Sequence, residues 1–185
     1  SSFRRLQGKM QLLGIRNDQF FRNRLTHSLE VAQIARSIAC AIQYDASESY
    51  VVEAGALAHD LGNPPFGHAG ERFLNEIFAP IGGFEGNAQT LRILTNLEKK
   101  RPDFRGLNLT YRTMLSVVKY FNKFDYEKYK SGDKKQKFIY DDDYELLKKF
   151  IEELKLKLQI SNLRVISNDL NKKIKYYTYP FHNTR

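Results

Sequence analysis

Apolar side chains recur every three or four residues over most of the chain, which is the spacing of one face of an α-helix. The pattern is clearest over residues 26–43 and 47–60, and further helices are expected over residues 66–80 and 87–97. Thr26 is expected to cap the first helix. The apolar stripe of that helix consists of His27, Val31, Ile34, Ile38 and Ala41.

The second half of the chain is less regular. Asn108 or Thr110 is expected to open a helix that ends near Tyr120, whereas residues 121–142 are rich in lysine and tyrosine and indicate an exposed excursion. A shorter helix is expected over residues 163–173, followed by an extended segment over residues 176–180. The strongest amphipathic helix precedes both, directly after residues 121–142, with a stripe of Leu147, Phe150, Ile151, Leu154 and Leu158. No segment alternates as a strand does, so the sequence predicts an all-α fold.

Composition restricts the classes of protein that this chain can belong to. At 185 residues, 42% hydrophobic and 28% charged, it matches one globular domain. It has no run approaching the roughly 18 apolar residues of a membrane helix. The single cysteine excludes an intrachain disulfide, and a cytoplasmic location is the default interpretation.

The net charge of +9 is concentrated in the second half. Residues 101–185 hold 19 Lys and Arg against 11 Asp and Glu. This excess fits either a lysine-rich solvated surface or a surface that attracts nucleic acid or phosphorylated ligands. Tyrosines lie among the lysines, as in proteins that stack single-stranded bases, although such tyrosines more often serve packing. They are Tyr111, Tyr120, Tyr126 and Tyr129.

Three of the four histidines lie between positions 27 and 68, and one of them precedes an aspartate. A single histidine on an apolar helix face is usually a hydrogen-bonded core residue. Two such histidines with an adjacent aspartate favour a metal site, because imidazole and carboxylate together suit divalent ions. Such an ion would be able to act on water and phosphate.

Two sequence blocks carry a family resemblance. RLTHSLEV at residues 24–31 and HDLGNPPFGH at residues 59–68 resemble the deoxyguanosinetriphosphate triphosphohydrolases of the HD-domain superfamily. Residues 5–7, Gln11 and residues 106–110 are similar to the same family. The resemblance covers roughly residues 4–120 and implies an HD-domain helical bundle.

Carried over by position, the resemblance implies that His27, His59 and Asp60 bind a divalent metal, Mn²⁺ or Mg²⁺, with other first-row metals open. His68 and Glu71 match the family's catalytic pair, which serves the attacking water or the leaving group. A spacing of three residues places both on one helix face, where the carboxylate can orient the imidazole.

The resemblance also implies substrate contacts. Arg24 matches an arginine that contacts phosphate, and Gln11 matches a residue that reads the deoxyribose. Asn63 stands where some relatives have another histidine, and we place it with the substrate-binding residues. The implied reaction splits dGTP, and other deoxynucleoside triphosphates as further substrates, into deoxynucleoside and inorganic triphosphate.

In the family, a second aspartate completes the metal site, and it lies in an alanine-rich acidic segment. This sequence contains no such segment. The candidates in other contexts are Asp103, Asp125, Asp133, Asp169 and residues 141–143. We therefore expect an N-terminal fragment of a larger enzyme, with a core over residues 1–120 and a basic helical extension of the same domain over residues 121–185. The activity is expected in the full-length parent, and this polypeptide is expected to be weakly active or inactive. His182 is expected to be structural.

Three further expectations remain open. Family resemblance implies a homo-oligomer, with a hexamer as one form, and no membrane partner. One alternative function is an HD phosphohydrolase of another nucleotide substrate, such as nucleoside monophosphates, cyclic nucleotides or guanosine polyphosphates. The other alternative is a module that binds single-stranded nucleic acid or regulates another protein through the basic half.

Overall fold

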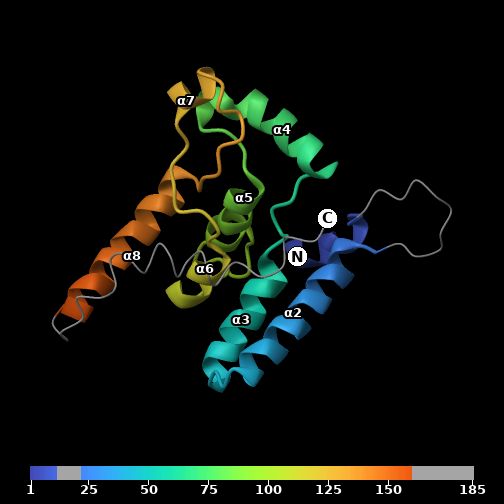
Figure 1. The fold of residues 1–185 in the computed structure, drawn as a ribbon, viewed down its shortest axis with the longest axis vertical. Helices are drawn as coiled ribbons and strands as arrows, with labels where there is room; N and C mark the ends of the chain where they lie inside the picture. Colours follow the sequence, from blue (N-terminus) through green and yellow to red (C-terminus); the bar gives the residue numbers. More distant parts are fainter. Residues whose placement is uncertain (12–21, 160–185) are drawn as a thin grey trace.

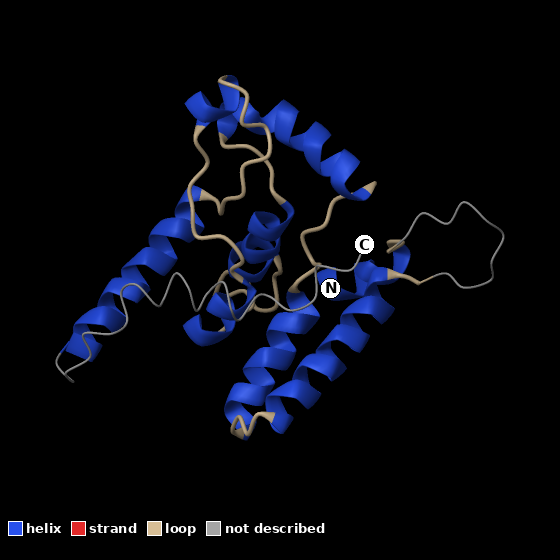
Figure 2. Cartoon of the chain, in the orientation of Figure 1, coloured by secondary structure: helices blue, strands red, loops and turns tan. Residues whose placement is uncertain are grey.

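The computed structural model describes residues 1–11 and 22–159, with the side chains of residues 153–159 left outside that description. Helices and loops make up this part of the chain, and the only strand-like contact in it is an isolated bridge between Met10 and Asn23 (Figures 1 and 2). The predicted all-α class is therefore confirmed. None of the described helices is long and apolar enough to cross a membrane.

The first elements place two long helices side by side. After α1 (Ser2–Arg5) and a 3₁₀ turn, η1 (Leu6–Gly8), come α2 (Arg24–Ala41) and α3 (Ala46–Ala58), an antiparallel pair (Figure 1). The predicted cap of α2 is wrong. Asn23 caps the helix by accepting a hydrogen bond from Thr26 N at 2.8 Å, so α2 begins two residues earlier than predicted.

The remaining elements are shorter until the last. They are α4 (Gly67–Phe78), η2 (Ala79–Ile81), α5 (Gly86–Arg92), a π-helical turn η3 (Ile93–Leu97), α6 (Tyr111–Val117), α7 (Tyr126–Lys130) and α8 (Asp141–Gln159). The helix predicted over residues 87–97 is thus an α-helix that continues as a π turn, and Thr110 rather than Asn108 caps α6. The elements predicted over residues 163–180, and His182, lie outside the described residues.

The face of α2 that the periodicity assigned to the core is partly exposed. Ile34 and Ile38 are each more than 40% exposed, whereas the buried residues of α2 are Ser28, Ala32 and Ala39. Small side chains let two helix backbones approach closely, so α2 packs through its small residues rather than through its isoleucines.

The prediction of an exposed excursion over residues 121–142 is wrong in part. The first half contains α7, whose Tyr129 is buried, and in the second half Phe138 is fully buried and Ile139 is 2% exposed. Ile139 belongs to the same core as residues from both ends of the described chain, including Leu6 and Leu147. The segment has no helical period because it enters the core as an irregular loop, which periodicity does not detect.

A close backbone contact fixes the turn after α3. A Cβ on Gly62 would lie 2.2 Å from both Gly86 O and Thr90 N of α5, so only glycine fits there. The Gly62 N–H donates to Thr90 Oγ1 at 2.9 Å, and Thr90 Oγ1 also contacts the carbonyl of His59 at 3.3 Å. Helix α5 therefore holds the HDLG turn in place.

Candidate functional site

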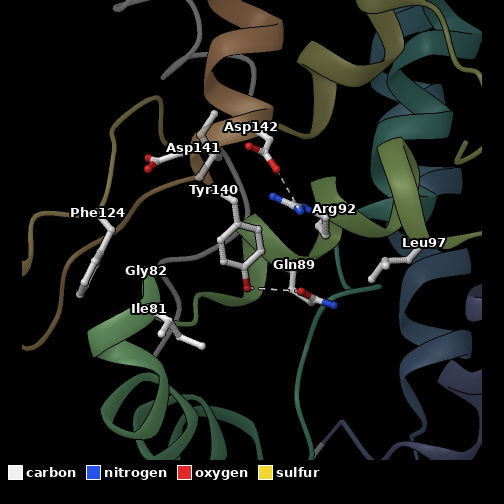
Figure 3. Close-up of a pocket in the computed structure, with 10 residues that line it drawn as sticks. Ile81, Gly82, Gln89, Arg92, Leu97, Phe124, Tyr140, Asp141 and Asp142 are labelled. Atoms are coloured by element: carbon white, nitrogen blue, oxygen red, sulfur yellow. Dashed lines mark hydrogen bonds and ion pairs between the residues drawn. The ribbon is translucent and has the colours of Figure 1, made fainter.

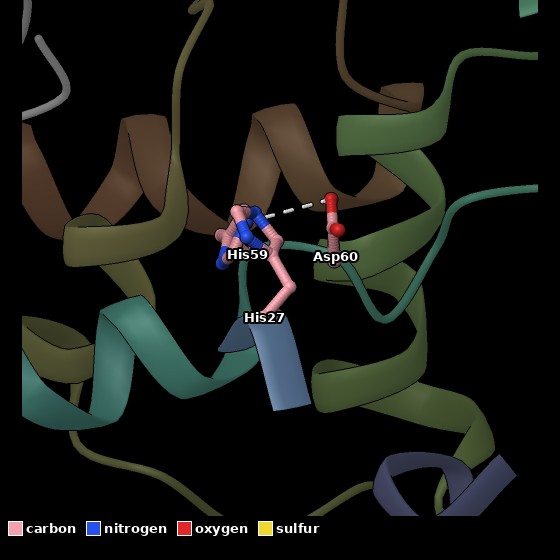
Figure 4. Close-up of side chains that lie close together, drawn as sticks. All are labelled: His27, His59 and Asp60. Atoms are coloured by element: carbon pink, nitrogen blue, oxygen red, sulfur yellow. Dashed lines mark ion pairs between the residues drawn. The ribbon is translucent and has the colours of Figure 1, made fainter. Parts of the chain in front are cut away.

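The structure brings His27, His59 and Asp60 together. His27 lies in the first turn of α2, and the other two directly follow α3, whose partner helix is α2 (Figure 4). One ligand atom of each residue lies within 4.8 Å of those of the other two. In the part of the chain that the structure describes, no other group of three or more His, Cys, Asp or Glu side chains meets this condition.

The His59 ring is held in one tautomer. Its Nδ1 lies 2.6 Å from the carbonyl oxygen of Ala56, and because a carbonyl only accepts, Nδ1 carries the proton. Nε2 is then left with a free lone pair and lies 3.5 Å from Asp60 Oδ1. A backbone carbonyl on the far nitrogen is the usual way in which proteins orient a histidine that binds a metal.

The His27 ring is prepared for the same role by burial. Its Nδ1 is buried and has no hydrogen-bond partner among the described residues, which is a costly state for a polar atom. Burial is the main cause that lowers the pKa of His27, and it outweighs the nearby Asp60 carboxylate, which raises it. The imidazole is therefore neutral at pH 7, the form that binds metals. The His27 and His59 rings meet edge to face at 5.4 Å.

Asp60 is a buried carboxylate with two partners from the same sequence blocks. Arg24 NH1 donates to Oδ2 at 2.7 Å, and Asn63 Nδ2 donates to Oδ1 at 2.5 Å. Both side chains of the Arg24–Asp60 pair are about nine-tenths buried. Arg24 is thus paired with the candidate metal ligand Asp60, and its contact with phosphate stays a prediction.

These three residues fit a divalent metal. Each histidine offers a ring nitrogen and the aspartate offers a carboxylate oxygen, and these three atoms lie close together. Imidazole and carboxylate ligands are compatible with Mn²⁺, Mg²⁺ and other first-row ions. The orphaned Nδ1 of His27 is the strongest sign, because a bound cation would satisfy it.

His68 and Glu71 form a second cluster, on the first turns of α4. His68 Nδ1 lies 3.0 Å from Glu71 Oε2, and the His68 side chain is 87% exposed. Glu71 Oε1 accepts from the Gly86 N–H at 3.2 Å and from Lys137 Nζ at 3.1 Å. Burial alone would raise the pKa of Glu71, but the hydrogen bonds from His68 and Gly86 and the charge of Lys137 lower it below its ordinary value.

Gly86 connects the two clusters. A Cβ built on it would lie 3.6 Å from Asn63 Oδ1, which belongs to the Asp60 cluster, and 3.8 Å from Glu71 Oε1. The candidate metal ligands and the His–Glu pair are therefore neighbours across the start of α5.

Gln11 and Lys9 line the approach to α2. The Gln11 N–H donates to the carbonyl of Arg22 at 3.0 Å, and its Oε1 is buried with no hydrogen-bond partner among the described residues. The backbone carbonyl of Lys9 accepts a hydrogen bond from the Arg24 N–H, and the Lys9 Nζ donates one to the carbonyl of Asn63 at 2.7 Å. Burial, followed by repulsion from Arg24, lowers the pKa of Lys9.

Sequence reasoning missed both lysines at the site. Lys9 lies between residues 5–7 and Gln11, which resemble the family, and this position was the only sign in the sequence that Lys9 belongs to the site. Lys137 lies 66 positions from Glu71 in a segment without periodicity, and only the adjacent apolar pair Phe138 and Ile139 hinted that this stretch is buried.

A cavity of about 450 Å³ lies elsewhere, between α5, η2 and the start of α8 (Figure 3). Its polar side chains are mostly engaged: Arg92 pairs with Asp142, and the Tyr140 hydroxyl donates to Gln89 at 3.3 Å. Burial raises the pKa of Tyr140 to about 12, so its phenol stays neutral. None of the predicted site residues lines this cavity, which therefore does not belong to the candidate site.

The sequence that forms this site matches a known protein family. A family model described as HD domain matches residues 24–144, from the first residue of α2 into α8. The match contains the three candidate metal ligands, the His–Glu pair and Lys137.

Individual relatives are similar over most of the chain. A protein of Vibrio cholerae named deoxyguanosinetriphosphate triphosphohydrolase-like protein 2 is 56% identical over 148 residues, which is 80% of this chain and 35% of that protein. A deoxyguanosinetriphosphate triphosphohydrolase-like protein of Caulobacter vibrioides is 48% identical over 150 residues, 79% of this chain and 36% of that protein. The chain spans about a third of the length of these curated relatives. It belongs to the HD-domain family, and within that family it is similar to proteins named deoxyguanosinetriphosphate triphosphohydrolase-like.

Proposed function

We propose that this chain carries the catalytic centre of a metal-dependent deoxynucleoside triphosphate triphosphohydrolase. The reaction converts dGTP, and other deoxynucleoside triphosphates as further substrates, into the deoxynucleoside and inorganic triphosphate. The observation that supports it most is the convergence of His27, His59 and Asp60 beside the His68–Glu71 pair. The names of the relatives supply the substrate class.

His27, His59 and Asp60 would hold the ion, for which we propose Mn²⁺ or Mg²⁺. When bound, the ion supplies positive charge that neutralises phosphoryl oxygens and makes water more acidic. The fourth ligand is proposed to be an aspartate from the part of its relatives' length that this chain does not span.

The chain's own groups account for proton transfer and binding. Water attacks the α-phosphorus, the bond from that phosphorus to the 5′ oxygen breaks, and the 5′ oxygen leaves with a proton. His68 exchanges a proton with the water or the leaving oxygen, because Glu71 occupies Nδ1 and leaves Nε2 exposed. Arg24, Lys9 and Asn63 are proposed for the phosphates, and Gln11 Oε1 for the deoxyribose hydroxyl.

Product analysis tests the proposal. The full-length parent protein is incubated with dGTP and Mn²⁺, and phosphorus NMR identifies the phosphate species released, whereas the 185-residue chain alone should release little or none. Intact triphosphate, formed with Mn²⁺ and absent with EDTA, is the expected result, and Asp60→Asn should abolish it. Release of monophosphate or pyrophosphate would instead assign the chain to another class of HD phosphohydrolase. A homo-oligomer belongs to the same proposal, and light scattering of the purified protein measures it.

Binding of single-stranded nucleic acid is a second candidate, supported by a groove of about 460 Å³ next to α7. Its cationic side chains are Arg72, Lys130, Lys134 and Lys135. Of the four interleaved tyrosines, Tyr126 and Tyr129 line this groove, Tyr126 being 38% exposed and Tyr129 buried, whereas Tyr111 stacks on Phe150 at 4.1 Å. The groove therefore offers four cations, beside the carboxylate of Glu76, and one exposed aromatic ring.

The second candidate predicts salt-dependent binding. Fluorescence anisotropy with a labelled single-stranded oligonucleotide should show affinity that falls steeply as salt rises. Replacing Lys134 and Lys135 by Gln should weaken the binding, whereas Lys99→Gln, far along the chain from the groove, should not. Absence of binding at low salt would remove this candidate.

A further inference from the structure

The ammonium group of Lys137 bridges two carboxylates from different elements. Its Nζ lies 2.8 Å from Oε1 of Glu85, the residue before α5, and 3.1 Å from Oε1 of Glu71 on α4. Lys137 itself comes from the loop between α7 and α8. One side chain thus connects three parts of the chain beside the His–Glu pair.

Glu85 gives this lysine its anchor. Glu85 is 1% exposed and caps α5 by accepting from Ala88 N at 2.8 Å, and its other oxygen accepts from Asn87 Nδ2 at 2.7 Å. A buried carboxylate needs a cationic partner as well as hydrogen bonds. Burial lowers the pKa of Lys137, but the charges of Glu85 and Glu71 outweigh it, so the lysine stays protonated.

Glu71 is held by this arrangement in one orientation. Lys137 Nζ and the Gly86 N–H both donate to Oε1, which leaves Oε2 directed at His68 Nδ1. A carboxylate that accepts from Nδ1 places the proton on that nitrogen and leaves Nε2 free. The orientation of an exposed histidine is therefore controlled from a residue that does not touch it.

We propose that Lys137 is a positioning residue that fixes the Glu71 carboxylate and thereby the tautomer and orientation of His68. Its catalytic consequence rests on the proposed function, whereas its effect on the His68 ring does not. A purely structural role, in which Lys137 only neutralises the buried Glu85, is the competing explanation.

Four variants separate the two roles. Lys137→Met removes the bridge, and Lys137→Arg keeps a cation that can reach both carboxylates. The double variant Lys137→Met/Glu85→Gln removes the bridge and the buried charge together, so it carries the test where the single variant fails to fold. Lys123→Met is the matched control, since Lys123 pairs with Glu145 and lies over the Tyr144 ring, away from the site.

Nitrogen NMR of the metal-free chain measures the His68 tautomer, with His68→Gln assigning its signals among the four histidines. The wild type, Lys137→Arg and Lys123→Met should carry the proton on Nδ1. Lys137→Met and the double variant should shift toward the Nε2–H form. If Lys137→Met keeps the proton of His68 on Nδ1, the positioning role is overturned. It is also overturned if the proton moves in Lys137→Met but is back on Nδ1 in the double variant, because the buried charge of Glu85 alone then explains the change.

Hydrolysis of dGTP by the full-length parent protein, wild type or carrying the same substitutions, gives the second measurement. Lys137→Met and the double variant should lose about 10- to 100-fold in kcat with KM unchanged, the range typical of residues that orient a functional side chain. Lys137→Arg should recover most of the loss. Full recovery in the double variant, or a change in KM alone, contradicts the inference. A wild-type protein without hydrolysis counts against the proposed function only, and the tautomer then decides the role of Lys137.

Discussion

The surroundings of each candidate metal ligand prepare it for binding. Burial keeps His27 neutral, the Ala56 carbonyl places the proton of His59 on Nδ1, and Arg24 pairs with Asp60. The contacts of His59 and Asp60 are single hydrogen bonds with residues that are not candidate ligands. The site therefore depends as much on its hydrogen-bond partners as on the residues that would bind the metal.

Glu71 gives a pH-dependent prediction. Because its pKa in the folded state lies below the ordinary value of 4.5, the unfolded chain binds the proton more tightly, and ionised Glu71 stabilises the fold above that pH. Wild-type protein should therefore exceed Glu71→Gln in free energy of unfolding at pH 7. The difference should shrink as the pH falls through 4.5 and disappear below the folded-state pKa.

Urea unfolding in EDTA at pH 7 and at pH 3 measures this difference. Glu76→Gln, on the exposed part of the same helix, controls for the loss of a carboxylate from α4. An advantage of wild type over Glu71→Gln that is as large at pH 3 as at pH 7 would contradict the prediction.

Besides its apolar contacts with the core, helix α8 is linked to α5 and the π turn by one buried aspartate. Asp143 Oδ2 accepts from Arg92 Nε at 3.0 Å, and its Oδ1 accepts from Thr95 Oγ1 at 2.8 Å. Both partners belong to α5 and the π turn that follows it. The adjacent Asp142 side chain is 86% exposed and approaches Arg92 only to 3.6 Å. This contact also fixes the loop before α8, from which Lys137 reaches Glu71.

The two aspartates are a matched pair for mutation. Asp143→Asn should lower the free energy of unfolding by about 1.5–3 kcal/mol, as expected for hydrogen bonds to a charged group. Asp142→Asn should change it by less than about 0.5 kcal/mol, as is usual for exposed positions. Both lie in the first turn of α8, so the helix dipole affects them equally and the difference isolates the buried contacts. Equal losses in chemical denaturation would refute this account of how α8 docks.

In the whole molecule, the candidate metal ligands connect two helices that are joined by a single turn. His27 begins α2, and His59 and Asp60 follow α3, so the ligands lie where the open end of the helical pair meets α5 (Figure 1). Leu61, next to Asp60, belongs to the hydrophobic core, and the Gly62 contact with α5 follows it. An ion bound at this point would add a cross-link between the start of α2 and the end of α3.

Mn²⁺ should therefore stabilise the folded chain. An ion that binds only the folded state contributes about 2.7 kcal/mol at a concentration of 100 times its Kd. Thermal unfolding should shift upward with added Mn²⁺ and return on addition of EDTA. His59→Ala should lose the shift, whereas His68→Ala, whose ring is outside the three-residue group, should keep it. An equal shift in both variants would place the bound ion elsewhere.

The amino-acid sequence alone determined the class of fold and the identity of the candidate ligands. Helical periodicity is a local property, so the long helices were predictable to within a few residues at their ends. The HD-containing blocks were recognisable because their residues are close in sequence. The caps at Asn23 and Thr110 and the buried face of α2 were less predictable, since they depend on which neighbouring helix packs there.

Only the tertiary structure decided which distant groups complete the site. Lys137, Glu85 and Glu71 meet because a buried carboxylate requires a cation, and the loop before α8 supplies one from 52 positions away. Gly86 brings the His–Glu pair next to the metal-binding group because α5 packs tightly on Gly62. Neither contact has a periodic signature, since long-range electrostatic and backbone contacts depend on the folded arrangement of irregular segments.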